Sequence, residues 1–153
     1  MTIVLRPMRW WDVEAVLEID RAVFGPTAWT AELFWAELAQ RSRTYLVAEP
    51  GAAGPEASVI GYAGLLVNGP EADVQTIGVA PAAQGRGLGA LLVSTLVEQA
   101  RAAGATALLL EVRADNDPAA NLYRKFGFER IGVRRRYYQP GDIDAVIMRK
   151  RPL

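Results

Sequence analysis

Glu111 is the residue whose type and surroundings point most directly to acid–base chemistry. It interrupts an otherwise apolar run at residues 107–112, where an unpaired carboxylate would be costly to bury. A general base would make use of such a carboxylate. A structural ion pair with Arg113, two residues further on the same face of a strand, would explain it equally well.

Two further side chains after this run are candidates for the same site. Tyr123 lies on a predicted helix, where its phenol could protonate a leaving thiolate or simply pack with its hydroxyl reaching water. Asn116 comes just before that helix and could hydrogen-bond an extended ligand, although an Asx-turn is an equally good explanation.

The sequence has no histidine and no cysteine. These absences exclude the commonest general base, the Ser-His and Cys-His nucleophile pairs and any thiolate metal site. A carboxylate, tyrosine, lysine or bound water must then move protons, and we expect no metal. Transfer from an already activated donor fits, because it mainly requires positioning, one base and one acid.

A glycine-rich loop at residues 84–89 indicates a phosphate site between a predicted strand and a predicted helix. Glycine permits φ > 0 and close approach, so backbone N–H groups can converge on an anion at the positive end of the helix. A purely structural turn is the alternative. The loop lacks the Gly-Lys-Ser/Thr ending of ATP-binding loops and the glycine spacing of dinucleotide sites, which favours another phosphate-bearing ligand.

Composition limits the remaining classes. With 153 residues, 51% of them hydrophobic, the chain is predicted to form a single domain, 1–153. Basic and acidic residues number 17 each, so no global field attracts nucleic acid or a membrane. The apolar runs are too short to span a bilayer and the N-terminus lacks a signal-peptide pattern, so we expect a cytoplasmic protein.

Periodicity and breakers predict an α/β (α+β) fold with the order β-α-α-β-β-β-α-β-α-β-β. Thr30 is predicted to cap the second helix, Gly104 to end the third, and Asp117 to cap the fourth with Pro118 at its first position. The run at 107–112 is predicted to be buried on both faces. The predicted strands are 3–6, 44–49, 59–67, 73–79, 107–112, 129–138 and 142–149, and the predicted helices are 10–24, 31–38, 88–103 and 117–126, with a surface turn at 50–58.

Aromatic and basic residues suggest where an acceptor would bind. The four tryptophans, Trp10, Trp11, Trp29 and Trp35, are predicted to be core or helix-packing residues. Trp29 lies in the loop between two helices and is the one expected to touch a substrate. The arginine-rich segment at 130–138 is predicted to be a solvated sheet edge or a substrate rim, with no direct contact to nucleic acid.

Four segments, 76–81, 84–89, 110–116 and 122–128, resemble the GCN5-related N-acetyltransferase (GNAT) superfamily. Segments 110–116, 134–138 and 144–148 further resemble RimI-type ribosomal-protein alanine N-acetyltransferases. The resemblance covers essentially the whole chain. It implies the GNAT fold, a mixed and mostly antiparallel central sheet of about seven strands with four helices on both faces.

The resemblance also implies acetyl-CoA as co-substrate and a role for each candidate. Glu111 would be the general base, acting through water, Tyr123 the general acid, and Asn116 a coenzyme contact. Main-chain groups of Ile77, Gly78 and Val79 would align the pantetheine arm. The pyrophosphate loop would comprise Gln84, Gly85, Arg86, Gly87, Leu88, Gly89 and Ala90.

The implied acceptor is a protein N-terminal α-amine, specifically the N-terminal alanine of a ribosomal protein, contacted by Trp29, Tyr137 and Tyr138. The junction at residues 24–30 is longer by two residues than the usual pattern, and Asp73 is a rival base. A small-molecule amine such as a polyamine or antibiotic is the alternative acceptor, and a non-catalytic acyl-CoA-binding module is the alternative class. We expect a monomer or weak homodimer.

Overall fold

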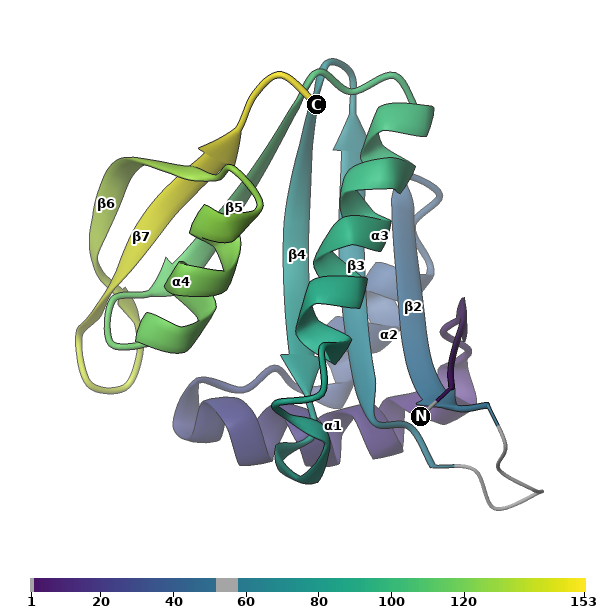
Figure 1. Ribbon diagram of the computed structural model, residues 1–153. Coiled ribbons are helices and arrows are strands. Elements are labelled where there is room, and N and C mark those ends of the chain that lie inside the picture. The colour runs from purple at the N-terminus through teal and green to yellow at the C-terminus, as the bar shows by residue number, and fades with distance from the viewer. Residues whose placement is uncertain (1, 52–57) are drawn as a thin grey trace. The chain divides into compact units, whose positions relative to one another are not determined.

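The computed structural model describes residues 2–51 and 58–153. Within these residues, seven strands and four α-helices follow one another in the predicted order (Figure 1). The predicted turn at 50–58 falls largely on residues 52–57, outside the described residues. The elements are β1 Ile3–Pro7, α1 Val13–Phe24, α2 Ala31–Leu38, β2 Arg43–Pro50, β3 Gly61–Asn68, β4 Glu71–Val79, α3 Leu88–Ala102, β5 Ala107–Arg113, α4 Asp117–Lys125, β6 Glu129–Tyr138 and β7 Ile143–Lys150, with 3-10 turns η1 Trp10–Asp12, η2 Gly25–Thr27 and η3 Pro81–Ala83.

The strands are ordered β1-β2-β3-β4-β5-β7-β6 in one sheet. β4 and β5 run parallel, whereas β1 with β2, β5 with β7, and β6 with β7 run antiparallel. Asp73 of β4 is paired with Leu109 of β5, and Glu111 of β5 with Ile147 of β7. The predicted mixed, mostly antiparallel sheet is confirmed. Among the described residues, no helix is both long and apolar enough to cross a membrane.

The chain divides into two compact units, Met1–Gly64 with Thr76–Leu92, and Leu65–Gln75 with Val93–Leu153. The core of the first unit contains residues of α1, α2, β2 and β3. Phe34 and Tyr62 are fully buried there, and their rings meet edge to face at 6.1 Å. Thr30 caps α2 as predicted, because its Oγ1 accepts a hydrogen bond of 3.2 Å from the Leu33 N–H.

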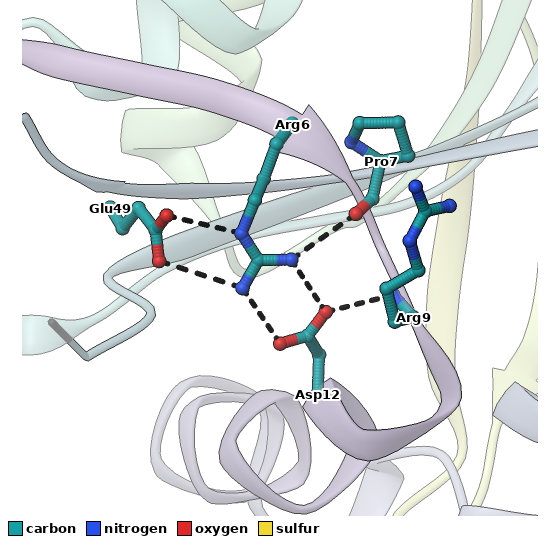
Figure 2. A network of polar contacts seen from close by, with 5 residues as sticks. All are labelled: Arg6, Pro7, Arg9, Asp12 and Glu49. Atoms are coloured by element: carbon teal, nitrogen blue, oxygen red, sulfur yellow. Dashed lines mark hydrogen bonds and ion pairs between the residues drawn. The ribbon is translucent and has the colours of Figure 1, made fainter. Parts of the chain in front are cut away.

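Arg6 joins β1, β2 and η1 in the first unit (Figure 2). Its guanidinium donates two hydrogen bonds, of 2.8 and 2.9 Å, to the Asp12 carboxylate and another of 3.1 Å to Glu49 Oε1. Asp12 Oδ2 also accepts a 2.8 Å bond from the Arg9 N–H. The bidentate geometry makes this a strong charge-assisted pair that fixes the start of η1.

The first helix begins later than predicted, and three of the four tryptophans predicted to lie in the core or to pack on helices are exposed. Trp10 and Trp11 belong to η1 and expose 71% and 60% of their surface, and Trp35 on α2 exposes 50%. Asp12 takes the buried position of η1, because its carboxylate is held by Arg6. The tryptophans of that turn therefore face outward.

The second unit is built on β5. Leu108, Leu110 and Val112 are buried, whereas Leu109, Glu111 and Arg113 on the other face of β5 are only half-buried. The prediction that both faces of this strand are buried is therefore wrong. Upstream of β5, α3 ends at Gly104 as predicted. Gly104 has φ +91°, and the N–H of the next residue bonds the Ala100 carbonyl at 3.0 Å, the pattern of a Schellman motif.

Candidate active site

The glycine loop leads into α3 in the first unit, as predicted. Gly85 and Gly87 have φ of +78° and +81°, a backbone conformation that residues with a Cβ rarely adopt. The Gly87 carbonyl accepts the first hydrogen bond of the helix, from the Leu91 N–H at 3.0 Å. The N–H groups of residues 88–90 are therefore those that an α-helix leaves without a partner inside the helix. Gln84 donates its side-chain amide to the Val79 carbonyl at 3.2 Å, which ties the loop to β4. This geometry suits a phosphate.

The end of β4 before this loop is packed tightly against β3. A Cβ on Gly78 would lie 2.5 Å from the Tyr62 hydroxyl, closer than side-chain atoms approach. That hydroxyl donates a hydrogen bond to Asp20, which is fully buried. Glycine is therefore required at position 78 for the main chain to lie against a buried tyrosine.

Trp29, the expected acceptor contact, lies just after η2 in the first unit. Its ring is half-buried and packs on Phe34 with centroids 4.9 Å apart. Its backbone N–H donates a 2.6 Å hydrogen bond to Asp20 Oδ2. The position of Trp29 is thus fixed from the core.

Glu111 in the second unit is paired with a residue from β6. Arg134 Nε lies 3.1 Å from Glu111 Oε1, and the two side chains are 57% and 26% exposed. Arg113, which the sequence suggested as a partner, forms an ion pair of 2.9 Å with Asp115. The pairing of Arg134 with Glu111 is not predictable from the sequence, because it depends on the register of β6.

Asp73, the rival base, faces the same charges. Burial raises its pKa, the negative charges of Glu71 and Glu111 raise it further, and Arg134 lowers it. Asp73 and Glu111 therefore influence each other electrostatically. Among the residues that the structure describes, no group of three acidic side chains could hold a metal ion.

Tyr137 and Tyr138 lie beside Glu111. Their rings meet edge to face at 5.1 Å, and the Arg134 guanidinium lies 5.5 Å from the centre of the Tyr137 ring. Burial raises the pKa of Tyr137, and the charge of Glu111 and a hydrogen bond with it raise that pKa further. Burial raises the pKa of Tyr138 to about 12, with Glu111 the next contribution. Both hydroxyls thus stay protonated at neutral pH.

Tyr123 lies at the end of α4, where the helix closes at Gly127 as predicted. Its carbonyl accepts a 3.1 Å bond from the Phe128 N–H, and the two rings pack at 5.9 Å. Burial raises the pKa of Tyr123, and a further contribution comes from Tyr138. The hydroxyl therefore stays protonated at neutral pH, and its ring packs on Phe128.

Asn116 is the N-cap of α4, a role that the sequence assigned to Asp117. Its Oδ1 accepts a 3.3 Å bond from the Ala119 N–H, so Asp117 and Pro118 occupy the first two helical positions. Asn and Asp side chains can both cap a helix. Here Asn116 has non-helical backbone angles and Asp117 is already helical, so Asn116 is the residue in the capping position.

Residues 10–128 match the acetyltransferase (GNAT) family. The chain belongs to this family. It is therefore an acetyl-CoA-dependent N-acetyltransferase, as the sequence motifs predicted. The matched span includes the glycine loop, Glu111 and Tyr123 and ends before Arg134.

Comparison with named proteins shows which acetyltransferases of the family this chain resembles. It is 40% identical over 144 residues to N-alpha-acetyltransferase RimI of Mycobacterium tuberculosis, which covers 91% of this chain and 86% of the relative. It is 41% identical over 80 residues to [ribosomal protein bS18]-alanine N-acetyltransferase of Escherichia coli K12, covering 51% and 54%. The crystal structure of the ribosomal-protein-S18-alanine N-acetyltransferase from Escherichia coli superposes with a TM-score of 0.85 at 26% identity, covering 99% of this chain and 94% of that one.

The predicted site residues of this acetyltransferase fall into two groups. The glycine loop, Ile77–Val79 and Trp29 belong to the first unit. Glu111, Asn116, Tyr123 and the tyrosine pair 137–138 belong to the second, where contacts bring Glu111 and the tyrosine pair together.

Proposed function

We propose that this acetyltransferase acetylates the N-terminal alanine α-amine of a ribosomal protein, with Glu111 as general base and Tyr123 as general acid. The names of the relatives support this acceptor, since the Escherichia coli proteins that the chain resembles are named for alanine of ribosomal protein bS18 or S18. The observation that carries the base assignment is the carboxylate of Glu111, held by Arg134 and Tyr137 in a chain that has no histidine.

The chemistry removes two protons from the acceptor ammonium and supplies one to the departing sulfur. Acetyl-CoA supplies an activated acyl carbon as a thioester. Glu111 takes the first proton, through water, from the acceptor ammonium. The amine nitrogen then forms a bond to the acyl carbon and releases its second proton to solvent. As the carbon–sulfur bond breaks, the Tyr123 hydroxyl gives its proton to the departing sulfur, and solvent returns a proton to Tyr123.

The glycine loop suits the coenzyme. Positive φ at Gly85 and Gly87 turns successive N–H groups toward the start of α3, where the helix dipole favours a pyrophosphate. Arg86 is exposed in the loop and supplies a positive charge. We assign pantetheine alignment to main-chain groups of Ile77–Val79 and a coenzyme contact to Asn116. Trp29, Tyr137 and Tyr138 are assigned to the acceptor.

Two substitutions test the base and the acid. With acetyl-CoA and an N-terminal alanine peptide, we expect Glu111→Gln to lower kcat by about 100-fold or more and Tyr123→Phe by about tenfold or more, the range for one acid–base group. Glu98→Gln on α3, whose carboxylate pairs with Arg101 in solvent, is the matched control and should keep wild-type turnover. Thiol release measures all three variants. Wild-type turnover in both active-site variants would remove the catalytic assignment.

The acceptor is tested separately. A panel of peptides and small amines, read by mass spectrometry, should show acetylation on the α-amine of alanine peptides. Acetylation of a polyamine or an antibiotic with no product on alanine peptides would overturn the protein acceptor and leave the N-acetyltransferase assignment in place.

A further inference from the structure

β6 contains an irregularity just before the two neighbouring tyrosines, Tyr137 and Tyr138. Arg134 is paired with Ala145 of β7, and the next pair is Tyr138 with Ile143. β6 therefore uses two more residues than β7 to cover the same stretch, which is a bulge. Within it, Arg136 has φ +55°, in the left-handed region that residues other than glycine seldom adopt.

Asp144 of β7 holds this bulge in place. Its Oδ1 accepts a 2.9 Å hydrogen bond from the Arg136 N–H. Its backbone carbonyl accepts another 2.9 Å bond, from the Ala114 N–H just after β5. A left-handed residue that is not glycine persists only where its surroundings compensate for the strain. One residue thus connects the bulge to the end of the strand that carries Glu111.

The bulge changes where the two tyrosines point. In a regular strand, consecutive side chains lie on opposite faces of the sheet. Here Tyr137 and Tyr138 are in ring contact and both are affected by Glu111, one through a hydrogen bond and both through its charge. The extra residues therefore bring the Tyr137 hydroxyl to the Glu111 carboxylate, with the Tyr138 ring against Tyr137.

We propose that Asp144 is a positioning residue for acetyl transfer, which acts by holding the left-handed backbone of Arg136 and so directs the hydroxyls of Tyr137 and Tyr138 toward Glu111. The proposal rests on the proposed function, in which Glu111 is the base. A carboxylate held by the Tyr137 hydroxyl and by Arg134 keeps one orientation toward the incoming amine, and misplacement by about 1 Å can cost catalysis on the order of 100-fold. We assign Asp144 no contact with either substrate, because it acts through Arg136 and the tyrosines.

Amide exchange tests the first link without any acceptor. In Asp144→Ala, the Arg136 amide should exchange about fivefold faster, the factor for one lost hydrogen bond of about 1 kcal/mol. Asp144→Asn keeps an oxygen at the bonding position and should preserve the wild-type rate. Asp115→Ala is the matched control, because it removes an exposed carboxylate that pairs with Arg113 in the same unit. An unchanged exchange rate in Asp144→Ala would overturn the proposal.

A double-mutant cycle tests the second link. Asp144→Ala should lower kcat/KM for the alanine peptide by about tenfold or more. When Tyr137→Phe and Tyr138→Phe are already present, the same substitution should change kcat/KM by less than about twofold, because Asp144 would act through hydroxyls that are gone. Fully additive effects would overturn the proposal. Wild-type turnover of Glu111→Gln would instead show that Glu111 is not the base. The exchange rate of the Arg136 amide does not depend on that role, so the two failures are distinguishable.

Discussion

The carboxylate of Asp20 accepts a hydrogen bond of 2.6 Å from the backbone N–H of Trp29. Asp20 is fully buried on α1, and its other oxygen accepts the hydroxyl of Tyr62. A buried acid thus fixes the segment that leads into α2 and supports β3 beneath Gly78. Its protonation state should influence the stability of the whole first unit.

Asp20 should make the first unit less stable as the pH rises. Burial raises its pKa above 3.8, although bonds from Tyr62 and Trp29 lower it in part. The folded state then binds the proton more tightly than the unfolded state, so the contribution of Asp20 is largest below 3.8 and is lost as pH rises through the folded pKa. Urea unfolding from pH 3.5 to 7 should show the advantage of wild type over Asp20→Asn shrinking with pH. A constant difference would contradict this expectation.

Asp12 should show the opposite pH dependence, which makes Asp12→Asn the matched comparison. Burial raises the pKa of Asp12, but hydrogen bonds from Arg6 and Arg9 outweigh burial, and the pKa lies below 3.8. The stabilisation is therefore present above 3.8 and is lost as pH falls through the folded pKa. At pH 7 we expect Asp12→Asn to cost about 2 kcal/mol in free energy of unfolding, typical of a hydrogen-bonded charge. The same urea series should show this cost disappearing in acid.

Gly78→Ala should destabilise the first unit. The new Cβ would lie 2.5 Å from the hydroxyl and 2.6 Å from ring atoms of Tyr62, which is fully buried and has no room to move. We expect a loss of about 1–3 kcal/mol, typical of overpacking. Gly132→Ala on β6 is the control, because its Cβ would meet only Ile147 at 3.7 Å, an ordinary contact. Thermal unfolding of the two variants measures the difference, and equal midpoints would contradict the expected clash.

The features that sequence predicts well here are those with local causes. Thr30 caps a helix and Gly104 ends one because capping depends on the side chain or φ of a single residue. Glu111 was recognised because a carboxylate in an apolar run needs an explanation. The cap of the fourth helix was predicted one residue too late, at Asp117 instead of Asn116, because either side chain can cap a helix.

The features that sequence missed depend on contacts between distant segments. Arg134 reaches Glu111 through the register of β6, and the bulge at Arg136 changes the pairing of Tyr138 further along the strand. Trp10 and Trp11 are exposed because Asp12, held by Arg6 of β1, takes the buried position in their turn. The hydrophobic periodicity of one segment does not predict which residue of a distant segment a side chain will contact.

Gly87→Ala should weaken acetyl-CoA binding as well as stability. At φ +81°, alanine costs about 1–2 kcal/mol, or else the loop changes shape and its N–H groups turn away from the pyrophosphate. Gly69→Ala is the matched control, because Gly69 has φ +78° and equally open surroundings in the turn between β3 and β4. Both variants should lose similar stability in urea, but only Gly87→Ala should raise the KM for acetyl-CoA. A normal KM in Gly87→Ala would argue against the phosphate role.

Asp73 reports on the charges around Glu111, and it gives two predictions of opposite sign. The charge of Glu111 raises the pKa of Asp73, and that of Arg134 lowers it. Carboxyl NMR titration should therefore find a lower Asp73 pKa in Glu111→Gln and a higher one in Arg134→Gln. Asp73→Asn, assayed beside Glu111→Gln, should keep turnover within a few-fold of wild type if Glu111 is the base. A loss of about 100-fold in Asp73→Asn, with Glu111→Gln unaffected, would transfer the role of base to Asp73.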